Sequence, residues 1–354
     1  MKALILAGGT GSRLRPITYS MAKQLVPVAN KPVIEFGIES ILQAGVTEFG
    51  IIIGDTGEAV KAAVGDGSRW GIKITYIPQP APLGLAHAVA TARPFLGDDD
   101  FVMYLGDNII KSSVRSLVEE FESLRPAATI LLTPVNNPSQ FGVAELEGSQ
   151  VKRLEEKPKE PKSNLALVGV YLFDKRIHDV IAELKPSARG EYEITEAIQG
   201  LIDRQLPVRS TIVEGWWKDT GDVAAMLEAN RLILEDMVGC VDGDIDAHSK
   251  LEGRITVGKG TTIVNSVVRG PVIIGDGCQI KDAYVGPFTA IADACVLEKS
   301  EIENSIVMAD CTIKDAPSRI ESSLIGRGAS ITRVDRRPSA MQLVLGDSSQ
   351  VVLP

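Results

Sequence analysis

The chain has 354 residues, of which 44% are hydrophobic and 23% charged, and its net charge is −9 at pH 7. This composition is typical of a globular protein with room for two domains, and an acidic chain without a basic stripe argues against a nucleic-acid partner. No stretch approaches the roughly 20 apolar residues of a membrane span, and the apolar N-terminal run is too short for a signal peptide. We therefore expect a cytoplasmic protein with no membrane partner.

Strand and helix signals alternate from the N-terminus to about residue 237. Short apolar runs predict strands at 3–6, 49–53, 73–77 and 101–105, and helical periodicity predicts helices at 32–44, 58–64, 84–92 and 223–237. This order predicts a Rossmann-like, mostly parallel sheet with helices on both faces over residues 1–240. Ligands of such sheets bind at the carboxyl ends of the strands.

The pattern changes after residue 240, where aliphatic residues recur every six positions. The pairs are Val257 and Ile263, Ile274 and Ile280, Val285 and Ile291, Val307 and Ile313, and Ile325 and Ile331. This spacing favours a parallel β-helix over residues 241–335, with an antiparallel β-sandwich as the alternative. Residues 336–354 are weakly patterned and are expected to form a cap or tail. The flat faces of a β-helix lead us to expect a homo-oligomer.

The four cysteines are Cys240, Cys278, Cys295 and Cys311. No two of them have the spacing of a redox or zinc motif, and the chain has only three histidines. We therefore expect buried, reduced cysteines that pack as small apolar side chains.

The first strand leads into the run Leu6-Ala7-Gly8-Gly9-Thr10-Gly11-Ser12-Arg13-Leu14-Arg15-Pro16, with Lys23 further on. Glycines at such a turn let backbone N–H groups approach anionic oxygens, and Arg13 and Lys23 add positive charge. The run lacks the Gly-Lys-Ser/Thr ending of a P-loop, and Leu14 stands where a dinucleotide-binding loop needs its third glycine. A triphosphate loop is thus favoured over a plain glycine turn.

The same run, with Lys23-Gln24-Leu25-Val26-Pro27-Val28 and Lys31-Pro32, resembles the signature of the sugar-1-phosphate nucleotidylyltransferases. Within them the chain is most similar to the thymidylyltransferases that act on glucose 1-phosphate and carry a C-terminal left-handed β-helix. The resemblance implies that dTTP and glucose 1-phosphate are joined by in-line attack on the α-phosphorus. The products would be dTDP-glucose and pyrophosphate. The cofactor would be Mg²⁺.

The resemblance also implies site residues. The nucleotide would be bound by Leu6, Gly8, Gly9, Thr10, Gly11, Ser12, Arg13 and Gln24, and its base by Gln79, Pro82 and Gly84. Mg²⁺ would be held by Asp107 and Asp219, and the sugar phosphate by Asn108, Gly142, Glu156, Lys157 and Val168. Arg13, Lys23 and Lys157 would be the catalytic residues. The stretch 189–195 would be mostly architectural, with Glu191 or Glu193 near the sugar, and His87 receives no role.

Three alternatives stay open on the residues alone. A uridylyl-, adenylyl- or guanylyltransferase would use the same scaffold, and thymine differs from uracil by one methyl group, worth about 1–3 kcal/mol. The β-helix could transfer an acyl group, although the only histidine after His178 is His248, ahead of the clear hexads. A regulator that binds nucleotide-sugars without turnover is the third alternative.

Overall fold

The computed structural model describes residues 1–148, 150–333 and 341–352. Contacts divide the chain into two compact units. The first contains Met1–Thr10, Met21–Leu25 and Val33–Asp219, and the second contains Gly11–Ser20, Val26–Pro32 and Thr220–Pro354. Residues 336–340 and 353–354 of the expected tail lie outside the described residues. Domain boundaries at 240 and 335 stay predictions.

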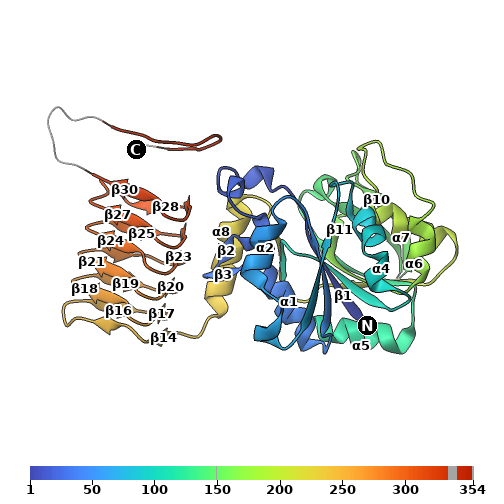
Figure 1. Ribbon diagram of the computed structural model, residues 1–354, viewed down its shortest axis with the longest axis horizontal. Helices are drawn as coiled ribbons and strands as arrows, with labels where there is room; N and C mark the ends of the chain where they lie inside the picture. The colour runs from blue at the N-terminus through green and yellow to red at the C-terminus, as the bar shows by residue number, and fades with distance from the viewer. Residues whose placement is uncertain (149, 334–340, 353–354) are drawn as a thin grey trace. The chain divides into compact units, whose positions relative to one another are not determined.

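Within its described residues, the first unit holds one nine-stranded sheet (Figure 1). Its order is β5 (Lys73–Pro78), β4 (Glu48–Ile53), β1 (Lys2–Ala7), β6 (Phe101–Leu105), β11 (Leu165–Phe173), β8 (Ala128–Pro134), β12 (Val208–Ile212), β10 (Gln150–Glu156) and β9 (Gly142–Glu147). Of these strands, β10 and β11 run against the rest. The predicted mostly parallel sheet is therefore confirmed.

Helices cover both faces of this sheet, as predicted. One face carries α1 (Val33–Gln43), α2 (Gly57–Val64) and α5 (Val114–Leu124), and the other carries α3 (Leu85–Thr91), α4 (Arg93–Leu96), α6 (Arg176–Ile181) and α7 (Ile194–Asp203). Side chains of β1 alternate between the two cores, with Ala3 and Ile5 in one and Leu4 and Leu6 in the other. A strand buried on both faces is apolar throughout, and this is why the continuous apolar run predicted β1 correctly.

Short elements connect the main ones. They are the 3₁₀ helices η1 (Ser12–Leu14), η2 (Ile17–Tyr19), η3 (Lys23–Leu25), η4 (Ser68–Trp70) and η5 (Pro138–Gln140), the hairpin of β2 (Pro27–Val28) and β3 (Lys31–Pro32), and the antiparallel pair β7 (Asn108–Ile110) and β13 (Trp217–Asp219). No helix of the described residues combines the length and the apolarity that a membrane crossing requires.

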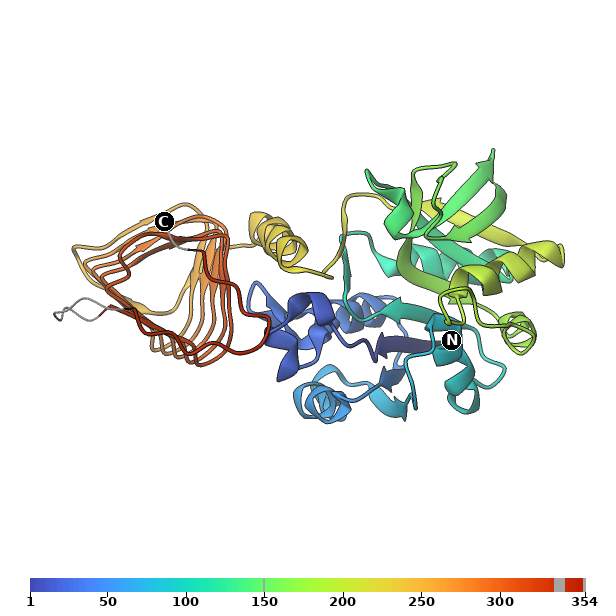
Figure 2. The same cartoon turned by 90° about the horizontal axis from the view of Figure 1, so that it is seen from above.

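The second unit contains helix α8 (Val223–Asp236) and a stack of short coils whose triangular outline is visible in Figure 2. Each side of the triangle is one parallel sheet. The first is β14 (Cys240–Val241), β17 (Ile255–Val257), β20 (Val272–Ile274), β23 (Thr289–Ile291), β26 (Ile306–Val307) and β29 (Leu324–Ile325). The second is β15 (Asp244–Ile245), β18 (Thr262–Val264), β21 (Gln279–Lys281), β24 (Val296–Glu298), β27 (Thr312–Lys314) and β30 (Ser330–Thr332). The third is β16 (Lys250–Glu252), β19 (Val267–Arg269), β22 (Tyr284–Val285), β25 (Glu301–Glu303) and β28 (Ile320–Glu321).

The hexad residues form the core of this stack. Ile263 pairs with Ile280, and Ile280 pairs with Leu297 on the next coil, so equivalent residues lie directly above one another. The predicted hexad residues are buried except Ile331, which lies on the last strand β30 and is 37% exposed. A left-handed β-helix, rather than a β-sandwich, is therefore confirmed.

Three of the cysteines form a ladder along the β-helix. Cys278, Cys295 and Cys311 are buried, and each thiol donates to a backbone carbonyl of the next coil at 3.0–3.2 Å. Thr261 occupies the same position one coil earlier and donates in the same way at 2.6 Å. The expectation of buried, unpaired cysteines holds for these three, whereas Cys240 is exposed.

Candidate functional site

Two carboxylates converge near the carboxyl end of strand β6. Asp107 directly follows this strand, and Asp219 ends β13, which pairs with β7 so that Asp219 lies opposite Asn108. The ammonium group of Lys23 forms an ion pair with Asp107 and lies 3.8 Å from Oδ1 of Asp219. Two carboxylates far apart in the sequence thus meet at one cation.

This arrangement fits a divalent metal. Mg²⁺ prefers oxygen ligands and is usually held by one or two carboxylates together with substrate phosphates. The described residues contain no group of three or more acidic, histidine or cysteine side chains that could hold a metal alone. Asp107 and Asp219 would hold the ion where Lys23 now places its charge, with the remaining ligands from a phosphate substrate.

Asn108 fixes the position of Asp107. Its side chain is 2% exposed, and it donates to Oδ1 of Asp107 at 2.8 Å and accepts from the indole N–H of Trp217 at 2.6 Å. Gly169 on β11 leaves room for this amide, since a Cβ there would lie 2.7 Å from Oδ1 of Asn108. The indole of Trp217 also meets the Phe141 ring edge-on. Sequence analysis assigned no role to Trp217.

The glycine-rich loop of the first unit runs beside two glutamines. A Cβ on Gly8 would lie 3.2 Å from Oε1 of Gln79, so the bare backbone allows this approach. Gln24, which is 2% exposed, lies close to Gly9 and Gly106. The predicted nucleotide residues Leu6, Gly8, Gly9, Gln24 and Gln79 are therefore brought together at the ends of the strands.

The segment from Gln79 to Gly84 is held by two residues that sequence analysis left without such a role. His87 Nδ1 lies 2.9 Å from Nε2 of Gln79, which orients the glutamine amide. Gly84 has φ 107°, and a Cβ there would lie 2.5 Å from the carbonyl oxygen of Tyr192. Pro82 lies in the loop between β5 and α3. A histidine inside a helix gives no sequence signal for such a contact.

Glu156 and Lys157 lie at the end of strand β10. Glu156 pairs in register with Gly142, and its carboxylate accepts a hydrogen bond from Thr195 at 3.3 Å. A Cβ on Gly142 would lie 2.6 Å from the Thr195 side chain, so glycine is required for this approach. Lys157 is exposed, with φ 43°, and its N–H donates to the carbonyl of Phe141.

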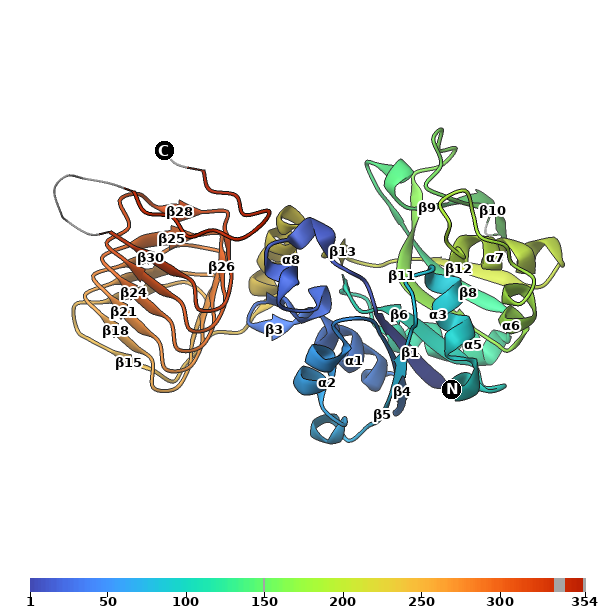
Figure 3. The ribbon, with the colours of Figure 1, turned by 45° about the horizontal axis from the view of Figure 1, so that its top comes forward.

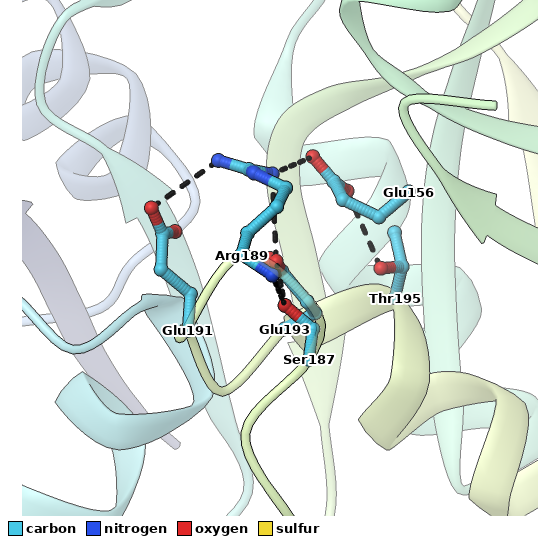
Figure 4. A network of polar contacts seen from close by, with 6 residues as sticks. All are labelled: Glu156, Ser187, Arg189, Glu191, Glu193 and Thr195. Carbon is cyan, nitrogen blue, oxygen red and sulfur yellow. Dashed lines mark hydrogen bonds and ion pairs between the residues drawn. The ribbon is translucent and has the colours of Figure 1, made fainter. Parts of the chain in front are cut away.

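Arg189 joins three carboxylates into one network (Figure 4). Its guanidinium lies 3.3 Å from Glu156, 3.4 Å from Glu193 and 3.2 Å from Glu191. Burial, together with the charge of Glu193, raises the pKa of Glu156 above its usual range, while Lys157 and Arg189 partly oppose that rise. The stretch 189–195, expected to be mostly architectural, thus places the Arg189 guanidinium beside Glu156, a residue predicted to bind the sugar.

Val168 lies where strand β11 leaves the ladder with β8, between Leu167 and Tyr171. Its side chain is fully buried in the core. A contact from Val168 to a ligand would therefore come from its backbone.

The rest of the loop belongs to the second unit. Gly11 has φ 62° and precedes η1, which carries Ser12 and Arg13. The hydroxyl of Thr18 donates to the carbonyl of Gly11 at 2.7 Å. Arg13 is exposed.

A glycine-rich loop after the first strand and two carboxylates meeting at the strand ends are features of a phosphate-binding α/β transferase. The nucleotidyl transferase family matches residues 2–236. The chain belongs to this family, whose enzymes generally use a divalent metal.

Relatives match the whole chain. The glucose-1-phosphate thymidylyltransferase of Streptomyces griseus is 56% identical and that of Streptomyces antibioticus 54% identical, and the matches cover 99% of each chain. A solved structure from Bacillus anthracis, described as a glucose-1-phosphate thymidylyltransferase in complex with sucrose, is 40% identical with a TM-score of 0.63. It covers 68% of this chain and 98% of that one.

Proposed function

We propose that the protein transfers a thymidylyl group from dTTP to glucose 1-phosphate and releases pyrophosphate and dTDP-glucose. The observation that carries this proposal is the convergence of Asp107 and Asp219 on one cation, in a chain of the nucleotidyl transferase family. The full-length similarity to two glucose-1-phosphate thymidylyltransferases supports the choice of substrates.

The reaction needs no protein nucleophile, because the phosphate oxygen of the sugar is already anionic. It attacks the α-phosphorus in line and forms a new P–O bond as the bond to the pyrophosphate oxygen breaks, so catalysis consists of positioning and charge neutralisation. Arg13 and Lys23 would neutralise the triphosphate and the leaving pyrophosphate. Thr10, Gly11 and Ser12 would present backbone N–H groups to the same oxygens.

Asp107 and Asp219 would hold Mg²⁺. The chemistry that such an ion supplies is charge neutralisation on the phosphate oxygens. Lys23, whose ammonium group pairs with these carboxylates in the structure, would then contact the phosphates instead.

The base and the sugar would be read by separate residues. The contact of Nε2 with His87 fixes the orientation of the Gln79 amide, so that Oε1 points to the other side. Oε1 would then accept a hydrogen bond from the imide N–H of thymine. The backbone N–H of Gly84 would donate to a base carbonyl. Asn108, Gly142, Val168 and Glu156 would surround the sugar, with Glu156 accepting from a hydroxyl.

We expect Lys157→Ala to raise the KM for glucose 1-phosphate by about tenfold or more, because a charge-assisted contact to phosphate is worth about 1.5–3 kcal/mol. The KM for dTTP should change little. Steady-state kinetics with each substrate varied will measure the difference. Lys152→Ala is the matched control, since Lys152 lies on β10, the strand that Lys157 directly follows, and its side chain is 63% exposed. An unchanged KM for glucose 1-phosphate in Lys157→Ala would remove this assignment.

The raised pKa of Glu156 predicts a pH dependence. The carboxylate becomes protonated at a higher pH than an ordinary glutamate, so the KM for glucose 1-phosphate should rise as the pH falls from about 8 to about 5. The ionisation of the sugar phosphate itself is common to all variants. Glu156→Gln should therefore show a higher KM at neutral pH and a flatter profile. Parallel profiles for the two proteins would contradict the role of Glu156.

A pyrophosphate-release assay tests the function as a whole. The purified protein is supplied with Mg²⁺, glucose 1-phosphate and each of dTTP, UTP, ATP and GTP, and then with dTTP and a panel of sugar phosphates. We expect the highest kcat/KM for dTTP with glucose 1-phosphate and a measurable rate with UTP. No pyrophosphate release with any pair would refute the proposed function.

A further inference from the structure

Part of the substrate-binding segment belongs to the same compact unit as the β-helix. The stretches Gly11–Ser20 and Val26–Pro32 cluster with residues 220–354, whereas Met21–Leu25 between them belongs to the first unit. The first stretch carries Arg13, and the second is the hairpin of β2 and β3. Specific contacts tie both stretches to the rest of this unit.

Two asparagines connect the hairpin to the two ends of strand β23 of the β-helix. Asn230 on α8 is fully buried, accepts from the N–H of Ala29 at 2.8 Å and donates to the carbonyl of Phe288 at 2.8 Å. Asn30 donates to the carbonyl of Ile291 at 2.7 Å. A buried amide that loses such partners leaves backbone groups unsatisfied, at about 1–3 kcal/mol each. The hairpin is therefore held to the β-helix by directional bonds.

The stretch that carries Arg13 is connected at a second point. Gly326 on the β-helix lies so close to Ile17 that a Cβ there would be 2.9 Å from the Ile17 side chain. Thr18, the next residue, donates to the carbonyl of Gly11, at the start of the turn that carries Arg13. A displacement at Gly326 would thus be passed to the turn through two adjacent residues.

We propose that the β-helix positions the nucleotide-binding segment: Asn230, Asn30 and the contact of Gly326 with Ile17 hold the two stretches in the conformation that presents Arg13. This inference rests on the proposed function, in which Arg13 meets the triphosphate. Asn30, Asn230 and Gly326 are positioning residues, because none of them would touch a substrate. The β-helix would then take part in nucleotide transfer without a chemical group of its own.

The sharpest test is Asn30→Gly. Asn30 has φ 62°, which glycine adopts without strain, so the change removes the side-chain bond to Ile291 and keeps the backbone. We expect about a tenfold loss of kcat/KM for dTTP, as misplacement of a binding group predicts, with the KM for glucose 1-phosphate unchanged. Asn265→Gly is the matched control, since Asn265 has φ 45° and donates to Asp282 on the β-helix.

Hydrogen exchange gives a second readout that does not depend on turnover. Asn30→Gly should raise amide exchange in residues 26–32, and Gly326→Val, which crowds Ile17, should raise it in residues 11–20. Strands β1, β4 and β6 should keep wild-type protection in both variants. Gly346→Val is the control for the second change, because nothing lies within 4 Å of a Cβ there.

The outcomes separate this inference from the proposed function. Wild-type kinetics and exchange in both variants would overturn the positioning role and leave the proposed function intact. A wild-type protein without thymidylyl transfer would refute the proposed function, and the exchange measurement would then still decide whether the β-helix orders the segment. An equal loss for dTTP and for glucose 1-phosphate would show a global defect and would also overturn the inference.

Discussion

Asp107→Asn and Asp219→Asn should each lower kcat/KM by about 10³-fold, a loss of about 4 kcal/mol of transition-state stabilisation. Each change removes one of the two negative charges that converge on Lys23, and with it an oxygen ligand of the proposed metal. The double variant should be little worse than either single one, because the two carboxylates act as a unit. Pyrophosphate release across a Mg²⁺ titration will measure both effects.

Asp98→Asn is the control for these variants. The Asp98 side chain is 65% exposed and forms ion pairs with Arg93 and Lys175, so it matches the chemistry of the change away from the site. Calorimetry of Mg²⁺ binding in the presence of a non-hydrolysable nucleotide separates a loss of metal affinity from a loss of turnover. Wild-type kcat/KM in Asp107→Asn would contradict the metal assignment.

Arg13→Ala should lower kcat/KM by about 10²–10³-fold, the usual effect of removing one group that stabilises transition-state charge. Arg13 is exposed and lies two residues after Gly11, whose carbonyl accepts a hydrogen bond from the Thr18 hydroxyl. Arg13→Lys should recover only part of the rate, because an ammonium keeps the charge and loses the planar fork. Steady-state kinetics with dTTP as the varied substrate will measure both variants.

Arg15→Ala is the matched control for this prediction. Arg15 is exposed two residues further on, and its guanidinium stacks on the Tyr19 ring at 4.8 Å. We expect near wild-type rates for this variant. Equal losses for Arg13→Ala and Arg15→Ala would mean that the loop needs general positive charge and would contradict a specific role for Arg13.

The fold was largely predictable because burial leaves a periodic trace. The predicted helix at 32–44 is α1 (Val33–Gln43), and the predicted strand at 101–105 is β6. Their apolar side chains face the cores, so the spacing of these residues in the sequence indicated both the type and the position of each element. The β-helix was predictable for the same reason, since each hexad residue contributes to one continuous core.

The site was less predictable, because its parts meet only in space. Asp107 and Asp219 become neighbours through the pairing of β7 with β13, two strands of three residues that carry no strong pattern. Only the resemblance to a family predicted that the two residues act together, because their spacing in the sequence gives no indication of it. Arg189 was expected to be architectural, yet its charge lies among three carboxylates. A lone arginine in a loop gives no sign of which acids it will meet.

The grouping of 11–20 and 26–32 with the β-helix was also hidden from the sequence. The contacts of Asn30 and Asn230 go to backbone carbonyls and a backbone N–H, which every residue type offers. A side chain that bonds to the main chain needs no particular residue type as its partner, so the sequence does not indicate where the partner lies. Only the folded chain reveals them.

The coil repeat restricts how the length of this chain can change during evolution. The coils of the β-helix lie one above another (Figure 3), and Thr261, Cys278 and Cys295 occupy equivalent positions 17 residues apart. Gaining or losing one full turn therefore keeps the strand pairing of the other turns in register. A turn added after Gly326 moves neither anchor, whereas a turn added between α8 and Phe288 would move the Phe288 carbonyl away from Asn230. Between Phe288 and Gly326, which anchor the hairpin and Ile17, one additional turn would separate the two anchors by a strand spacing of about 4.8 Å.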